Sequence, residues 1–351
     1  MEITVEKCPS NADNRQAKIS TILASGDQNI DLISVNDEMI SEFKHKGYLE
    51  PLEKNVMTEE VRDSFPQKYL ESICEENGHI YSVPFQMDIM MFWVNQELLK
   101  QAGLDEIKNT GDFDILQKSL KNPDQYAYGD AWENTYVYNS LSQFVNFWGG
   151  DYFDWTDPKT KDAARYMKSM LDEKNTSPAQ FVDQYEQMEE KFIRGKYGCV
   201  FMYTSALGTF LDADVYGKNK IHMAPLPVLH KKKATNIATW QYVLNNASEN
   251  KDAAVRFLQY AAGYEGSTEY AKIMKSYPAR VDVIENEDID LEGIDMIRKY
   301  LREYTLNARP LCENSMGAVS DMGKLFQGYV LGQCEEDSFF EQAQNCINTY
   351  Y

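Results

Sequence analysis

The first hundred residues alternate between two hydrophobic periods. Residues 2–6 (EITVE) and 30–35 (IDLISV) have the pattern of strands. Residues 11–25 and 37–46 repeat their apolar positions at helical spacing and are each followed by a glycine. This β-α-β-α order predicts a parallel sheet covered by helices on both faces.

Residues 81–104 (YSVPFQMDIMMFWVNQELLKQAGL) predict a long strand that turns at Asn95 into a short helix. Gln86 and Asp88 come just ahead of the most apolar part of that strand. A carboxylate beside a buried strand is costly unless it is paired, hydrogen-bonded or able to meet a ligand. The strand therefore contains a candidate binding residue.

The rest of the chain is mostly helical, with a second group of short strands. Sheet-like character appears near residues 1–94 and again near 197–244, with helical segments between and after them, which predicts two α/β lobes that share one chain. The later strands are predicted at 197–203, 222–227 and 240–244, and the helices at 134–148, from Pro158 onward, after a cap at Ser248, and through the last residues from Phe339 to Tyr350.

The composition limits the partners of the protein. A net charge of −20 makes nucleic acid and anionic membranes poor partners, because both select basic surfaces. The 23 Tyr, 16 Phe and 5 Trp suit a site that stacks on flat ligand faces. The six cysteines form no CxxC pair, so no structural zinc site is expected, although Cys312 could pair with Cys334 or Cys346.

Motifs of catalysis are absent from the sequence. It contains no GxSxG, P-loop, GxGxxG or HExxH pattern, the four histidines are scattered, and no pair of carboxylates can be assigned to one site by spacing. The acidic run at 285–292 lacks the regular oxygen spacing of a calcium loop. We therefore expect a protein that is not an enzyme and carries no cofactor or metal.

The tryptophans divide into two groups. Trp93, Trp148 and Trp155 lie in apolar or turn contexts that favour a packing role. Trp132 and Trp240 lie at loop boundaries with polar neighbours, where packing and ligand stacking are equally good interpretations.

Eight segments in order resemble the extracellular solute-binding proteins of carbohydrate ABC transporters, the maltose-binding-protein-like group. The most specific is HIYSVPFQMDIMMFWVNQELLKQAGL. The others are KISTILASGDQNIDLISVND, GYLEPL, QFVNFWGGDYFDW, KFIRGKYGCVFMYTSAL, MAPLPV, ASENKDAAVRFLQYAAG and YPAR. Together they cover nearly the whole chain.

The resemblance implies a two-lobed, type II periplasmic-binding-protein fold with a ligand cleft between the lobes and three hinge crossings. The N-terminal lobe would comprise residues 1–88 and 241–286, and the C-terminal lobe 89–240 and 287–351. The protein would capture a sugar, usually an oligosaccharide, by hinge closure and deliver it to membrane permeases. It would be a monomer outside the cell, either a surface lipoprotein or periplasmic.

The same resemblance implies a set of ligand-binding residues. Carboxylate, amide and guanidinium groups would bind hydroxyls, and aromatic rings would cover the apolar faces of the sugar. The set is Asn36, Asp37, Gln86, Asp88, Trp132, Tyr136, Tyr203, Ser205, Trp240 and Arg280.

Two departures from the family pattern change what is expected. Val94 stands where the family has Tyr, and Ser205 where it has Trp or Gly, so the floor of the ligand site would differ. The family's signal segment, first core strand and first helix are missing before EITVE, and we expect the natural start to lie upstream. The alternatives are a carbohydrate-active enzyme or lectin-like module, and a binding protein for a non-sugar solute such as a polyamine.

Overall fold

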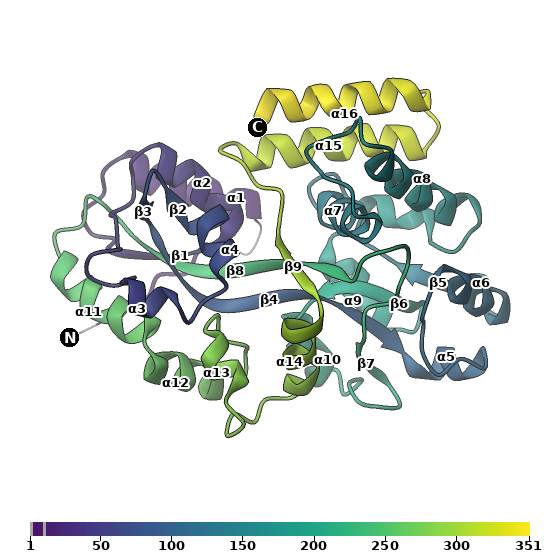
Figure 1. The fold of residues 1–351 in the computed structure, drawn as a ribbon, viewed down its shortest axis with the longest axis horizontal. Coiled ribbons are helices and arrows are strands. Elements are labelled where there is room, and N and C mark those ends of the chain that lie inside the picture. Colours follow the sequence, from purple (N-terminus) through teal and green to yellow (C-terminus); the bar gives the residue numbers. More distant parts are fainter. Residues whose placement is uncertain (1–2, 10–11) are drawn as a thin grey trace. The chain divides into compact units, whose positions relative to one another are not determined.

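The computed structural model describes residues 3–9 and 12–351, and the chain divides into two compact units (Figure 1). Unit 1 comprises residues 1–88, 238–294 and 311–316. Unit 2 comprises residues 89–237, 295–310 and 317–351. Two long strands, β4 (Ser82–Asn95) and β8 (Ala234–Leu244), each run from one unit into the other.

Unit 1 is built around the antiparallel pair of β1 and the second half of β8. The register places Asn36 opposite Trp240 and Leu32 opposite Leu244. In Figure 1, α1 and α2 lie above these strands and α12 and α13 lie below them. The elements of unit 1 are α1 (Ala12–Ala24), β1 (Leu32–Asn36), α2 (Asp37–His45), α3 (Glu59–Arg62), α4 (Gln67–Tyr69), the π-helical turn η1 (Leu70–Cys74), β2 (Glu75–Glu76), β3 (His79–Ile80), α11 (Lys251–Ala262), α12 (Tyr264–Met274) and α13 (Val281–Glu285).

Unit 2 is built on the second half of β4. Residues 90–95 of β4 pair antiparallel with β6 and with β7, and β5 adds to β6 in parallel. The first residues of β8 pair in parallel with β9. The elements of unit 2 are α5 (Gln96–Gln101), α6 (Thr110–Ser119), β5 (Tyr126–Gly129), α7 (Val137–Trp148), α8 (Pro158–Asp172), the 3-10 turn η2 (Pro178–Val182), α9 (Tyr185–Ile193), β6 (Tyr197–Tyr203), α10 (Ala206–Asp212), β7 (Ile221–Ala224), α14 (Ile294–Glu303), β9 (Thr305–Ala308), α15 (Ser315–Val330) and α16 (Glu336–Tyr350).

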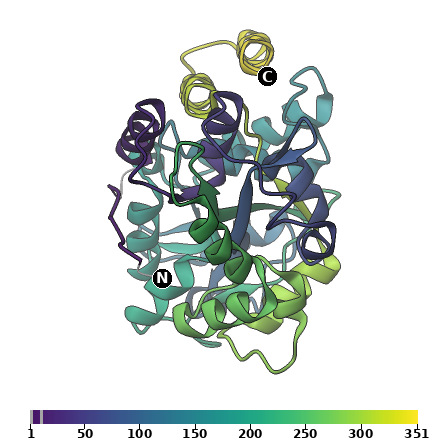
Figure 2. The same ribbon diagram turned by 90° about the vertical axis from the view of Figure 1, so that its left-hand side faces the viewer.

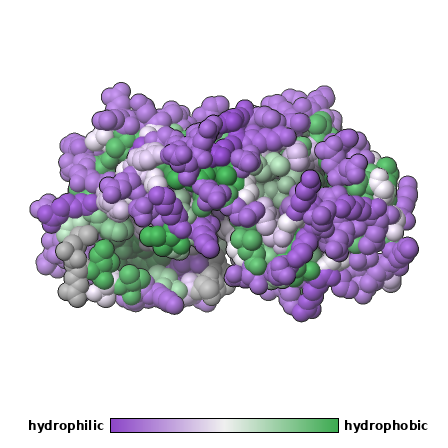
Figure 3. Space-filling view, turned by 90° about the horizontal axis from the view of Figure 1, so that it is seen from below, coloured by the Kyte–Doolittle hydropathy of each residue, from purple (hydrophilic) through white to green (hydrophobic). Residues whose placement is uncertain are grey.

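Aromatic side chains dominate the core of unit 2. Phe201 lies within ring contact of Phe92, Phe144 and Phe147. Trp93 and Trp155 are fully buried and Trp148 nearly so, which confirms the packing role expected for these three. On the surface seen in Figure 3, most residues are hydrophilic and hydrophobic residues appear in small separate groups.

Several sequence-based predictions are confirmed by the elements. Strand β6 has the predicted bounds, and β4 and α5 follow one another at Asn95. Helix α7 ends at Trp148 as predicted and is capped by Gly149, which has a φ of 70°. Asp157 caps α8, and its carboxylate accepts a hydrogen bond from the backbone N–H of Lys159.

Four details differ from the predictions. Residues 3–6 form no strand, and Ile3 and Val5 are exposed, because no neighbouring strand pairs with them. The strands of residues 1–94 do not form a parallel sheet, since β1 pairs antiparallel with the distant β8. Strand β8 starts at Ala234, ahead of the predicted start at Trp240, and Asn250 instead of Ser248 occupies the N-cap position of α11.

Figure 2 shows unit 1 in a second view, with the purple α1 and α2 apart from the green helices that follow β8. No helix among the described residues has the length and apolar character needed to cross a membrane. All six cysteines lie in the described part of the chain, and none of them forms a disulfide.

Candidate ligand-binding site

The structure brings two predicted residues of unit 1 together at the end of β1. Asn36 and Trp240 are directly opposite in the β1–β8 ladder, and both are half-buried. The Asn36 side chain caps α2 by accepting a hydrogen bond from the backbone N–H of Glu38. The guanidinium of Arg15 lies 5.2 Å from the centre of the Trp240 ring. This pair offers an amide and an indole to a ligand.

Asp37 has a different environment from its neighbour Asn36. Its side chain is completely buried, and Oδ2 accepts a hydrogen bond of 2.8 Å from the hydroxyl of Tyr69. The same hydroxyl contacts Oγ1 of Thr239 at 2.8 Å and accepts a 3.2 Å hydrogen bond from Nε2 of Gln241. The position of Asp37 therefore favours a structural role inside unit 1 over the predicted ligand contact.

Gln86 and Asp88 lie on β4 close to Tyr270. The hydroxyl of Tyr270 donates a 2.8 Å hydrogen bond to Oε1 of Gln86, which is half-buried. Burial raises the pKa of Tyr270 to about 12, and the nearby carboxylate of Asp88 adds to the increase. Asp88 itself is 6% exposed. Both residues stay candidates for binding hydroxyl groups.

Arg280 is held by groups of unit 1 on every side. Its guanidinium forms two hydrogen bonds with the carboxylate of Asp282, at 3.0 and 2.6 Å. It also donates to the carbonyl of Ala262 and to the hydroxyl of Ser64, at 2.8 and 2.7 Å. A bidentate, buried arginine of this kind fixes local structure. The geometry favours a structural role over the predicted ligand contact.

In unit 2, Tyr136 and Tyr203 are joined through two residues that the sequence did not single out. The hydroxyl of Tyr203 donates a 2.8 Å hydrogen bond to Oδ1 of Asn139, whose Nδ2 donates to the carbonyl of Tyr136. The ring of Tyr185 lies edge-on to both tyrosines, with centroid distances of 4.9 Å to Tyr136 and 6.0 Å to Tyr203. Ser205, two residues beyond β6, is exposed.

A third missed residue of unit 2 is Arg309, directly after β9. Its guanidinium lies over the rings of Tyr138 and Tyr203, 6.0 and 5.8 Å from their centres, and donates a 2.8 Å hydrogen bond to the Tyr138 hydroxyl. Burial lowers the pKa of Arg309 to about 9. An isolated Arg-Pro pair in the sequence gives no indication of this position, because it depends on the pairing of β9 with β8.

Trp132 has no exposed surface. Its indole N–H donates a 2.8 Å hydrogen bond to Asp130, and its ring packs edge-on against Phe181 and Phe326. Asp130 also accepts from Tyr128, Ser140 and the backbone of Ala131, and burial raises the pKa of this carboxyl group. Of the two interpretations open for Trp132, the structure favours packing.

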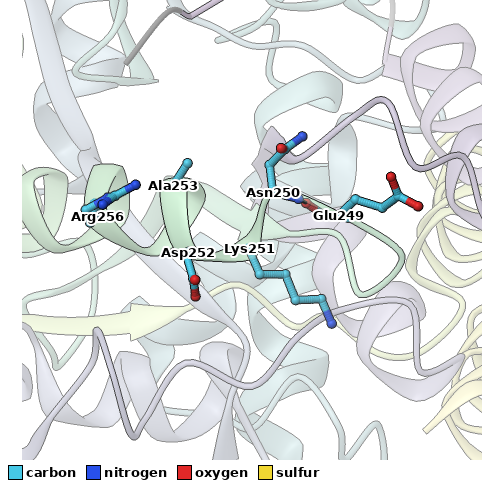
Figure 4. Close-up of a pocket in the computed structure, with 7 residues that line it drawn as sticks. Glu249, Asn250, Lys251, Asp252, Ala253 and Arg256 are labelled. Carbon is cyan, nitrogen blue, oxygen red and sulfur yellow. Dashed lines mark hydrogen bonds between the residues drawn. The ribbon is translucent and has the colours of Figure 1, made fainter.

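Two surface pockets lie away from these residues. The first, of about 380 Å³, surrounds the start of α11 and is lined by residues that include Glu249 and Arg256 (Figure 4). The second, of about 270 Å³, is lined in unit 2 by residues that include Tyr126, Lys191 and Lys196. Neither contains a predicted site residue. The described residues also hold no cluster of His, Cys, Asp or Glu suited to a metal.

Residues 4–268 match the model of the bacterial extracellular solute-binding protein family. The chain belongs to this family. Curated relatives include the arabinooligosaccharide-binding protein of Bacillus subtilis, 22% identical over 77% of this chain and 65% of its own length. A probable amino-acid ABC transporter periplasmic-binding protein of Sinorhizobium fredii is 24% identical over 65% of this chain and 54% of its own length. The chain thus spans between about half and two thirds of these relatives.

Solved structures of solute-binding proteins share the fold over almost the whole chain. A Thermotoga lettingae protein bound to α-D-tagatose has a TM-score of 0.83 and 18% identity, covering 96% of this chain and 89% of that one. Maltose-bound MalE3 of T. maritima has a TM-score of 0.81 and 17% identity, covering 97% and 90%. These matches show that the chain has the two-lobed periplasmic-binding-protein fold.

Proposed function

We propose that this solute-binding protein is the carbohydrate-binding component of an ABC importer and that its ligand is an oligosaccharide. In this proposal it binds the sugar without changing it and delivers it, as an extracellular monomer, to membrane permeases. The two units would close around the ligand through the crossing strands β4 and β8.

The observation that carries the proposal is the group of tyrosines in unit 2. The ring centre of Tyr185 lies 4.9 Å from that of Tyr136 and 6.0 Å from that of Tyr203, and both Tyr136 and Tyr185 are half-buried. Aromatic rings cover the CH faces of a pyranose. The buried amide of Asn139 holds two of these tyrosines in place, since it accepts from the hydroxyl of Tyr203 and donates to the carbonyl of Tyr136. Rings and neutral hydrogen-bonding groups at one place are typical of a sugar site.

Unit 1 contributes groups of the same chemistry. Asn36 and Trp240 again combine an amide with an aromatic ring, and Gln86 and Asp88 add acceptors for hydroxyl groups. Hydrogen bonds to a carboxylate are about twice as strong as neutral ones, so Asp88 would make the strongest single contact of this unit.

More of the relatives and structural neighbours are named for, or were solved with, a sugar than another kind of solute. The Bacillus subtilis relative is named for arabinooligosaccharides, and neighbours were solved with maltose, with cycloalternan and with α-D-tagatose. One relative carries an amino-acid name, so amino acids belong in the same test.

The test is isothermal titration calorimetry of the chain with monosaccharides, arabino- and malto-oligosaccharides, amino acids and polyamines. We expect tight binding of an oligosaccharide that is recovered intact by chromatography. Binding of only amino acids or polyamines would refute the sugar proposal, and recovery of hydrolysis products would show an enzyme instead.

A pair of variants locates the site. Tyr185→Ala removes the ring that contacts both Tyr136 and Tyr203 and should weaken binding about 10- to 100-fold, the effect of one stacking contact. Tyr166→Ala is the control, because Tyr166 is also a half-buried tyrosine of unit 2 but packs on Phe144 and Trp148. Equal affinities of the two variants would contradict this placement of the site.

A further inference from the structure

The two candidate ligand residues at the end of β1 are flanked by buried polar residues. Side chains alternate between the two faces of a strand. Trp240 is half-buried, whereas its neighbours Thr239 and Gln241 are buried. Asn36 is likewise half-buried and is followed by the buried Asp37. The neighbours of both ligand candidates therefore point into unit 1.

These buried neighbours meet at one atom, the hydroxyl oxygen of Tyr69. It donates to Asp37 at 2.8 Å, contacts the hydroxyl of Thr239 at 2.8 Å and accepts from Gln241 at 3.2 Å. Tyr69 comes from α4, a different segment from β1 and β8. Its ring is 2% exposed, and burial raises its pKa well above the usual value, so the hydroxyl stays protonated.

The network continues from Gln241 into the start of β4. Oε1 of Gln241 accepts hydrogen bonds from the hydroxyl of Ser82 and from the thiol of Cys74, the latter at 3.1 Å. All of these residues belong to unit 1. The segments before and after the Asn36–Trp240 pair are thus tied to the same buried group of hydrogen bonds.

We infer that Tyr69 is a positioning residue, whose hydroxyl fixes the backbone on either side of the Asn36–Trp240 pair and so holds these two side chains ready for ligand. The inference rests on the proposed function for its effect on affinity. Asp37 belongs to the same group as the acceptor that orients the Tyr69 hydroxyl. Without this hydroxyl, Asp37, Thr239 and Gln241 each lose one buried hydrogen bond, and the strand ends shift.

The experiment uses the full chain labelled with 5-fluorotryptophan, in which ¹⁹F NMR observes the 5 tryptophans separately. The Trp240 resonance is assigned from its loss in Trp240→Phe. We expect Tyr69→Phe to shift or broaden this resonance in the absence of sugar. We also expect it to lower the affinity for the oligosaccharide found in the calorimetric panel about tenfold, the effect of one buried hydrogen bond.

Tyr300→Phe is the matched control. Tyr300 is fully buried in unit 2, and its hydroxyl also makes two hydrogen bonds, to the carbonyl of Ala224 and from the N–H of Phe92. This control should leave both the Trp240 resonance and the affinity unchanged. Should Tyr69→Phe fail to fold, as shown by loss of dispersion in the other resonances, Thr239→Val removes one partner of the hydroxyl and is expected to shift the Trp240 resonance in the same direction.

An unchanged Trp240 resonance in the folded variant would overturn the inference, and so would a shifted resonance with unchanged affinity. If no carbohydrate binds the wild-type protein, the proposed function fails, whereas the fluorine measurement still decides whether Tyr69 positions Trp240.

Discussion

The two tryptophans that the sequence left undecided give a direct test of the site. Trp132 is fully buried, and its ring contacts Phe181 and Phe326. Trp240 is half-buried and faces the guanidinium of Arg15. Replacing each by Ala should therefore separate stability from binding: Trp132→Ala should affect stability, and Trp240→Ala should affect affinity.

The magnitudes follow from the contacts of each ring. Truncating a buried Trp costs about 3–5 kcal/mol through the lost burial and the cavity. Trp132 also donates one of the four hydrogen bonds to the buried Asp130, and an incompletely satisfied acceptor costs about 1–3 kcal/mol more. At Trp240 the lost cation–π contact is worth only about 0.5–1 kcal/mol of stability. Its loss as a stacking surface would weaken sugar binding about 10-fold or more.

The assay combines urea denaturation, followed by far-UV circular dichroism, with calorimetric titration of the sugar. Trp132→Phe keeps most of the ring and serves as the folded variant if Trp132→Ala does not express. We expect a lowered denaturation midpoint and wild-type affinity for the Trp132 variants, and the reverse for Trp240→Ala. Weakened binding with an unchanged midpoint in a Trp132 variant would refute the packing assignment.

Three further predictions concern single side chains. Asp88→Asn should weaken sugar binding about 10- to 100-fold by removing charge-assisted hydrogen bonds, and it should change the urea midpoint little. A large loss of stability at wild-type affinity would assign Asp88 a structural role. Arg280→Lys should lower the stability of unit 1 by about 2 kcal/mol, because lysine cannot replace the bidentate contact with Asp282. The affinity measured by calorimetry should stay unchanged. Weakened binding at full stability would instead support the predicted ligand contact of Arg280. Burial raises the pKa of Cys74 to about 12, so at pH 8 this thiol is neutral and should react with a disulfide reagent only after unfolding. The exposed Cys8 should react at once. Fast labelling of Cys74, mapped by mass spectrometry, would contradict its burial.

Local patterns in the sequence were enough to predict many of the elements. An apolar run predicted β6 with the bounds observed, and the Asp157-Pro158 pair marked the start of α8 because its cap needs only neighbouring residues. Segment motifs predicted the family and the two-lobed fold. The EITVE segment shows the limit of this approach: alternation is a local property, but a strand also needs a partner, and residues 3–6 have none.

The binding residues depended more strongly on tertiary structure. Motif positions predicted Asn36, Trp240 and Tyr136 as ligand contacts, yet they did not distinguish these half-buried residues from Asp37, Trp132 and Arg280, whose side chains the folded units enclose. Tyr185, Arg309 and Tyr69 were missed because their contacts join segments far apart in the chain. The sequence by itself determined many of the helices and strands, since propensity and periodicity act over a few residues. Only the tertiary structure decided which polar side chains satisfy one another inside a unit and which stay available to a ligand.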